Sequence, residues 1–170
     1  MRALKYGILI LVILTGGFFS IGFIKPTVEF QTKVTAEKPL EYSFAIFSNP
    51  MFITDWMTGL KSITYISGIP YQVGNQWELA MDYNGDKYIF IQEITEFEIY
   101  NNFQFTLRNE KMHVDVRIDF EETDGKTTIT TTNTFKGKSI LWRSLFPFFI
   151  GGIQESTQTD YNNLKALIEK

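Results

Sequence analysis

The chain begins with an uncharged segment that constrains what the rest of it can be. From Tyr6 to Ile24, 19 consecutive residues carry no charge, and all 19 acidic residues of the chain follow them. A helix needs about 20 apolar residues to cross a bilayer, and this segment just reaches that length. Lys25-Pro26 closes the segment, because proline resists continuing a helix. The sequence therefore predicts a membrane-spanning helix at the N-terminus.

Basic residues on either side of this helix predict its orientation. Arg2 and Lys5 precede it, and Lys25 follows it. Because basic residues are retained on the cytoplasmic side, we expect a cytoplasmic N-terminus. The chain then divides into a membrane anchor, residues 1–26, and one domain, residues 27–170. It would be a single-pass membrane protein whose domain is extracytoplasmic.

A cleaved signal peptide is the alternative interpretation of the same segment. Signal peptides have a shorter apolar region that ends in a small-x-small cleavage site. Ser20-Ile-Gly22 and Thr15-Gly-Gly17 fit that rule, but no Ala-x-Ala is present. We therefore favour a retained anchor over a cleaved signal. The absence of cysteine excludes a lipoprotein anchor.

Composition excludes several classes of protein. Beyond Lys25 the chain has 13 basic and 19 acidic residues, a net charge of −6, which excludes a general nucleic-acid binder. Without cysteine there is no disulfide scaffold, thiolate zinc site or cysteine catalysis. One histidine cannot build a histidine metal site, and we expect no metal and no cofactor. A hydrophobic share of 44% excludes disorder.

Alternation of apolar and polar residues dominates beyond residue 26 and predicts mainly strands. The predicted strands are residues 27–35, 60–67, 76–83, 87–95, 97–107, 112–121 and 127–135. Asn84-Gly85 and Asp124-Gly125 predict two-residue hairpin turns, because both positions of such turns favour a positive φ.

Helical spacing predicts two short helices and one long one. Leu40–Ser48 and Met51–Met57 are the short helices, between the first two strands. Ser139 caps the long C-terminal helix, which Pro147 and Gly151-Gly152 should bend. The predicted fold class is α+β: a curved antiparallel sheet of about six to seven strands that wraps the long helix. Because the helix cannot fill the concave side of the sheet alone, we expect a cavity between them.

Five short motifs within residues 27–170 resemble the SRPBCC superfamily of START-like, birch-pollen-allergen-like and polyketide cyclase/dehydrase-like domains, which have the helix-grip fold. The motifs are Ala36–Pro39, Phe47–Trp56, Tyr71–Gly74, Thr123–Thr127 and Tyr161–Glu169. Their order and spacing carry the resemblance. It implies the helix-grip fold but no single function, because members include lipid carriers, quinone binders, cyclases and chaperone activators. No catalytic motif of the superfamily transfers residue by residue.

Inward-facing aromatic and aliphatic side chains are the candidate cavity lining. They are Trp77, Met81, Tyr83, Phe103, Phe105, Val116, Ile118 and Phe120. The same pattern would suit a completely filled core. The resemblance places Trp56 near the cavity entrance, where it is either a plug of the core or a gate. Asn133, if it faces inward, needs a hydrogen-bond partner, either a backbone group or a ligand carbonyl.

Two further segments have competing interpretations. His113, Asp115, Arg117 and Asp119 share the charged face of one strand, which predicts exposed cross-strand ion pairs, with Arg108 pairing with one of them. Residues 140–150 carry one charge in 11 positions, too few residues to cross a bilayer. They form either the buried start of the long helix or a lip that touches the membrane.

These observations favour a membrane-anchored domain that binds a hydrophobic small molecule, such as a lipid, quinone or polyketide-like compound, without catalysis. The expected partners are that molecule and a membrane, contacted through Tyr6–Ile24 and, if residues 140–150 form a lip, through Trp142–Ile150; no nucleic acid is expected. One alternative is a cyclase/dehydrase-type enzyme, with Tyr83 or Asn133 as acid–base groups. The inward faces are almost free of titratable residues, which argues against it. The other alternative is a protein-interaction module.

Overall fold

A computed structural model describes residues 2–83 and 85–170. Its elements are α1 (Arg2–Ile24), β1 (Thr27–Ala36), α2 (Leu40–Ser48), α3 (Ile53–Trp56), β2 (Leu60–Ser67), β3 (Gln76–Tyr83), β4 (Asp86–Glu98), β5 (Asn102–Arg108), β6 (Met112–Thr123), β7 (Lys126–Gly137) and α4 (Ile140–Ile168).

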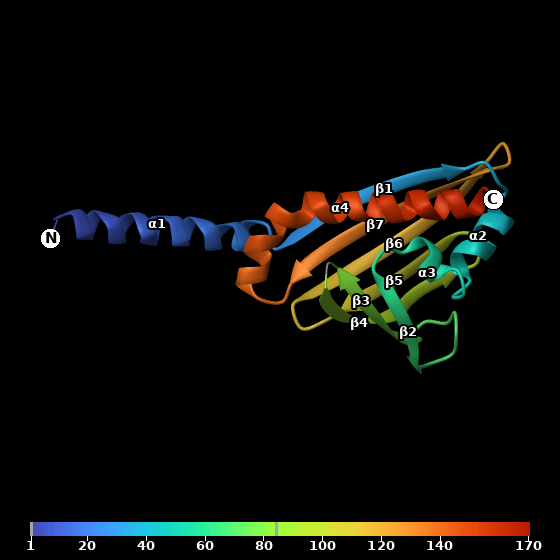
Figure 1. The fold of residues 1–170 in the computed structure, drawn as a ribbon, viewed down its shortest axis with the longest axis horizontal. Coiled ribbons are helices and arrows are strands. Elements are labelled where there is room, and N and C mark those ends of the chain that lie inside the picture. The colour runs from blue at the N-terminus through green and yellow to red at the C-terminus, as the bar shows by residue number, and fades with distance from the viewer. Residues whose placement is uncertain (1, 84) are drawn as a thin grey trace.

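The seven strands form one antiparallel sheet in the order β1-β7-β6-β5-β4-β3-β2. Each strand from β2 onward pairs with the next one along the chain, and β1 joins at the β7 edge. Figure 1 shows α4 lying along the curved sheet, with α2 and α3 at the end far from α1. The predicted α+β helix-grip fold is confirmed.

The element boundaries follow the sequence patterns except at α3, which covers Ile53–Trp56 instead of the predicted Met51–Met57, and around one turn. The sequence predicts a single strand over residues 97–107, but Phe97 still belongs to β4 and β5 begins at Asn102. The turn between them has Tyr100 at φ 64°, a conformation that the aromatic side chain does not signal. Asp124 and Gly125 have φ values of 53° and 72°, as a two-residue hairpin requires. Asn84, in the other predicted hairpin, lies outside the described residues.

The long helix α4 is continuous and carries the predicted cap. Ser139 is its N-cap, and the side chain accepts a hydrogen bond from the backbone N–H of Trp142. Pro147 lies inside the helix, and Figure 1 shows the first turns of α4 inclined to the rest. Leu164 and Ile168, one helical turn apart, are fully buried.

One edge of the sheet is closed by side chains of α4. Gln154, Gln158 and Lys165 each donate to a backbone carbonyl of β1, at 3.3, 3.3 and 2.7 Å. The three carbonyls belong to alternate residues, at positions 31, 33 and 35, which point the same way along the strand. The free edge of β1 is therefore occupied by helix side chains.

The helix α1 projects from one end of the domain (Figure 1). Leu4–Ile24 is the one helix in the described part of the chain that is long and apolar enough to cross a membrane, with a mean hydropathy of 2.4. The last turns of α1 contact the first turns of α4. Ser144 Oγ donates to the carbonyl of Phe19 at 3.5 Å, and Phe18 stacks on Phe148 with ring centroids 6.4 Å apart.

Candidate ligand cavity

A cavity of about 1020 Å³ lies between the concave face of the sheet and the helices. Its walls come from β2 to β7, α2, α3 and α4, and most of the side chains that line them are apolar or aromatic. The lining reaches exposed residues in three places. One is Tyr83 at the end of β3. The other two are Phe149 and Gly152 on α4, and Pro50 and Tyr71 in the loops beside α3. A space of this size accommodates a lipid-sized or polycyclic molecule.

The cavity brings together nine of the ten residues that the sequence singles out. Trp56, Trp77, Met81, Tyr83, Phe103, Phe105, Val116, Ile118 and Asn133 line it. Phe120 does not. Its ring packs edge-on against Phe44 and Phe47, at 5.1 Å each, in the core beyond the cavity. Alternation places Phe120 on the inner face correctly, but periodicity alone does not tell where along a strand the core ends and the cavity begins.

Trp56 is part of the inner wall and not an exposed flap. Only 4% of it is exposed, and its indole lies between Phe47 and Tyr161, with ring centroids 6.0 and 5.9 Å away. The backbone carbonyl of Trp56 accepts from Asn163 on α4 at 3.4 Å. These contacts hold α3 against α4. They favour the interpretation of Trp56 as a plug of the core over its interpretation as a gate to the cavity.

Asn133 is a buried amide in an apolar wall. It lies on β7 opposite Val116 and is 6% exposed. Its Nδ2 has no hydrogen-bond partner among the described residues. By contrast, the other buried amide of the cavity, Asn75, donates to the carbonyl of Ser67 at 2.8 Å and accepts from Trp77 Nε1 at 2.7 Å. The amide Nδ2 of Asn133 therefore lacks a hydrogen-bond acceptor, and a ligand oxygen can supply one.

An unpaired buried donor predicts an unusual mutational effect. We expect Asn133→Leu to raise the unfolding free energy of the empty protein by about 1–2 kcal/mol, because leucine has a similar shape and needs no partner. Asn75→Leu, which breaks two hydrogen bonds, should lower it by a similar amount. Urea unfolding of both variants in one detergent checks this. Destabilisation by Asn133→Leu would show that the amide is satisfied in the folded chain.

Asp160 is a cavity residue that the sequence analysis missed. It lines the wall on α4, one turn before Leu164, and its Oδ1 accepts from the backbone N–H of Thr58 at 2.8 Å. Burial raises the pKa of this carboxyl above its usual range, although the hydrogen bonds from Thr58 partly offset this. Burial, together with the charge of Asp160, raises the pKa of Tyr83 to about 12. Helical spacing could have indicated this, because Asp160 lies two helical turns after Ile153, which also lines the cavity.

The raised pKa of Asp160 makes stability depend on pH. A carboxyl whose pKa is higher in the folded than in the unfolded chain stabilises most below the unfolded value of about 4. That contribution is lost as the pH rises through the folded pKa. We expect Asp160→Asn to remove a slope of at most about 1.4 kcal/mol per pH unit in this window. Thermal unfolding across about pH 4–7 measures this slope. An unchanged slope would contradict the assignment to this carboxyl.

A cationic and aromatic group lies at the end of the cavity nearest α1. Lys111 Nζ lies 5.3 Å from the ring centroid of Trp142 and 5.4 Å from that of Tyr88. These three residues and Phe149 are all part of the lining. Cation–π contacts of this kind hold a lysine over apolar surface without a carboxylate partner.

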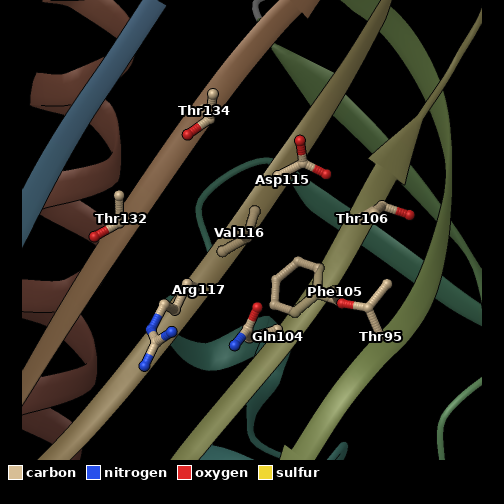
Figure 2. A pocket seen from close by; sticks show the side chains of 9 residues that line it. All are labelled: Thr95, Gln104, Phe105, Thr106, Asp115, Val116, Arg117, Thr132 and Thr134. Atoms are coloured by element: carbon tan, nitrogen blue, oxygen red, sulfur yellow. The ribbon is translucent and has the colours of Figure 1, made fainter.

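The outer face of the sheet carries a second, shallow hollow of about 380 Å³ (Figure 2). Its polar side chains are spread over four strands and include Asp115 and Arg117 of β6. The side-chain contacts here run along a strand instead of across strands: His113 forms a hydrogen bond with Asp115 at 2.8 Å, and Arg117 forms an ion pair with Asp119 at 2.9 Å. Arg108 does not join them.

Arg108 pairs instead with Glu93 on β4, so its predicted pairing on β6 is wrong. It lies diagonally across from Glu93, whose register partner on β5 is Thr106. The described residues hold no cluster of three or more potential metal ligands. The outer face is thus a solvated, internally paired surface, and the inner cavity is the candidate site.

The fold and the cavity together define an SRPBCC-type helix-grip domain, a class whose members bind hydrophobic ligands or act as polyketide cyclases. Within this class, the chain belongs to the family described as activator of Hsp90 ATPase homolog 1-like protein, whose model matches residues 37–169. No curated protein matches the chain in sequence.

Solved structures share this fold at low sequence identity. The Zhui aromatase/cyclase from Streptomyces sp. R1128 is 10% identical, with a TM-score of 0.72 over 84% of this chain and 94% of that one. Ara h 8.0201 is 15% identical, with a TM-score of 0.68 over 84% and 97%. TTHA0849 from Thermus thermophilus is 12% identical, with a TM-score of 0.69 over 83% and 97%. These likenesses establish the fold.

Proposed function

We propose that this chain is a membrane-anchored protein that binds a hydrophobic small molecule, a lipid, quinone or polyketide-like compound, in the cavity under α4. The observation that carries the proposal is the cavity itself, about 1020 Å³ in volume and walled by aromatic and aliphatic side chains. Transfer of apolar ligand surface from water into it contributes about 25 cal/mol per Å² before ordering costs. The solved aromatase/cyclase of the same fold supports a small-molecule role.

The anchor would keep this cavity where such ligands dissolve. In the proposal, α1 spans the bilayer, residues 1–26 form the anchor, and residues 27–170 form the binding domain. Trp142–Ile150, called here the lip, touches the membrane. Two observations support the lip: Phe148 and Phe149 are 64% and 55% exposed, and Phe148 stacks on Phe18 of the spanning helix. Exposed aromatic side chains beside a spanning helix are typical of membrane interfaces.

Identification of a bound molecule tests the binding proposal. The full chain is expressed in a membrane-containing host, purified in mild detergent and extracted with organic solvent, and the extract is analysed by mass spectrometry. One hydrophobic compound near one-to-one stoichiometry is the expected result. Membrane lipids that adhere to α1 are recognised because they also co-purify with the double variant Met81→Trp, Phe105→Trp, whose added rings fill the cavity. Identical extracts from the parent and that variant would overturn the proposal.

The absence of cysteine allows a clean test of anchoring and orientation. In Lys170→Cys, the single thiol lies at the C-terminus of the domain. We expect the chain to stay in the membrane during an alkaline wash, and this thiol to react with a membrane-impermeant maleimide in intact cells. Release by the wash would contradict the anchor, and labelling only after lysis would reverse the orientation.

Catalysis of the cyclase/dehydrase type is a second candidate, which one observation favours. Asp160 places a carboxyl with a raised pKa in the wall, and burial together with the charge of this carboxyl raises the pKa of the Tyr83 phenol. A carboxyl and a phenol in one wall can exchange protons with a bound carbonyl compound. Loss of water from the extracted compound during incubation with the parent, and not with Asp160→Asn, would support this role.

A further inference from the structure

Five basic side chains surround the junction of α1, α4 and the sheet. We call this set the basic collar: Lys25, Lys111, Lys136, Lys138 and Arg143. The whole chain has a net charge of −3, so a concentration of positive charge is not expected from composition. Three carboxylates lie nearby: Glu110, beside Lys111 in the β5–β6 turn, Glu29 on β1 and Asp115 on β6. Glu29 and Asp115 are both register partners of Thr134, and Asp115 contacts His113.

Register and backbone hydrogen bonds bring the collar together from four segments. Lys25 directly follows α1, and Lys136 pairs with Thr27 at the first position of β1. The backbone N–H of Lys138 donates to the carbonyl of Lys111 at 3.0 Å. These contacts set the ends of α1, β7 and the β5–β6 turn side by side.

Arg143 completes the collar from the first turn of α4. Its Nε donates to the carbonyl of Gly137 at 2.9 Å, so the guanidinium lies at the end of β7 beside Lys136 and Lys138. Within the described residues, none of the five collar side chains forms a salt bridge. Lys25, Lys136 and Lys138 are exposed. The collar is thus a set of cationic side chains without a salt-bridge partner in the described part of the chain.

The depth of the collar follows from its attachment to α1. The 21-residue span Leu4–Ile24 is about 31 Å long, close to the thickness of the hydrocarbon core, so Lys25 at its end lies at the headgroup level. Phe19, which accepts from Ser144, lies six residues earlier, about 9 Å deeper along the helix. The part of the lip that follows Arg143 therefore lies deeper in the bilayer than the collar, by about the depth to which interfacial helices bury their apolar faces.

We infer that the basic collar binds the anionic headgroups of the bilayer that α1 spans, and that this contact holds the lip in the acyl region beside the cavity. The inference rests on the proposed anchoring and adds the partner, an anionic lipid surface. Lysine and arginine side chains are attracted to such a surface, and the attraction fades within about one Debye length and with added salt. Lys111 connects the collar to the cavity, since it is one of the collar residues and also lines the cavity.

A fluorescent reporter in the first turn of α4 tests the inference. Leu141→Cys in the full chain is 45% exposed before substitution and gives a unique site for a nitrobenzoxadiazole label. The labelled chain is reconstituted in vesicles of phosphatidylcholine, with or without about one third phosphatidylglycerol. Quenching by a shallow doxyl lipid reports the depth of the label. We expect about twofold stronger quenching in the anionic vesicles, and loss of the difference at about 0.5 M salt.

Charge-reversal variants separate the collar from other basic residues. Lys136→Glu with Lys138→Glu should abolish the difference between the two vesicle types. The matched control, Lys33→Glu with Lys170→Glu, has the same net charge and lies away from the junction, and it should keep the difference. Equal quenching in both vesicle types, with the chain still embedded, would overturn the collar and leave the anchoring intact.

The same vesicles separate failure of the collar from failure of the anchor. If an alkaline wash removes the chain from all vesicles, the anchoring proposal fails. The collar is then judged by flotation of the unanchored chain, which should accompany anionic vesicles and not neutral ones. Flotation with neither, or equally with both, overturns the inference.

Discussion

Filling the cavity with two indole rings is expected to remove the ligand while the fold remains. Met81 on β3 and Phe105 on β5 both line the cavity, and Met81 is 8% exposed. In the double variant Met81→Trp, Phe105→Trp, the added ring volume takes up space where a wide molecule would lie. We expect at least about tenfold less bound compound per protein, because a loss of about 1.4 kcal/mol in binding has that effect. Mass spectrometry of extracts measures the ratio.

A control variant distinguishes a filled cavity from a damaged fold. Overpacking of a well-filled core costs about 1–3 kcal/mol, so a large drop in stability would indicate that no space was present. Phe120→Tyr changes a nearby ring that packs in the core outside the cavity, and it should keep the bound compound. If the double variant retains the compound at the parent's stoichiometry, the molecule is bound elsewhere.

Substitution of Gly22 is expected to separate α1 from α4. A Cβ at Gly22 would lie 2.6 Å from Ser144 Oγ and 2.9 Å from the backbone carbonyl of Ile140, closer than atoms in proteins approach. Gly22→Leu must therefore displace one helix from the other. Gly16→Leu is the matched control on the same helix, since nothing lies within 4 Å of a Cβ there.

A cross-link across the junction measures this separation. Phe18→Cys and Phe148→Cys place two thiols where the native rings stack at 6.4 Å. A short bis-maleimide should join them in the parent and in Gly16→Leu. In Gly22→Leu we expect the yield to fall about tenfold, the response to a contact weakened by about 1.4 kcal/mol. An unchanged yield would show that the close approach at Gly22 does not set the helix packing.

Local patterns in the sequence predict most of the fold because the strands have one solvent-exposed face and one buried face. Val114, Val116 and Ile118 alternate with charged residues on β6, and all three are buried. The prediction of a single strand over residues 97–107 is wrong for a local reason. Ile99 and Tyr100 are β-formers in composition, yet they occupy a tight turn in which Tyr100 has a positive φ.

The candidate site is less predictable than the fold. A cavity forms where packed side chains leave space between them, and the order of residues along one strand does not show this. Periodicity assigns Trp77 and Phe120 to the inner face alike, but only the packing of Phe44 and Phe47 shows that Phe120 lies in the core. The sequence analysis missed Asp160 as a cavity residue because a charged residue next to a buried tyrosine is usually assigned to the solvent-exposed side of a helix. Its place in the wall depends on the backbone of Thr58, which is distant in sequence.

The closure of β1 by α4 bears on how this domain could self-associate. An open edge strand offers unpaired backbone groups to another chain, and a sheet with two open edges can add copies without end. Here the four-residue spacing of Gln154 and Gln158, about 6 Å along the helix, matches the two-residue spacing of the β1 carbonyls, about 6.7 Å. Only β2 remains for strand addition. Edge-to-edge pairing would therefore stop at two copies joined through β2, and growth into a fibre is blocked by the helix that also covers the cavity.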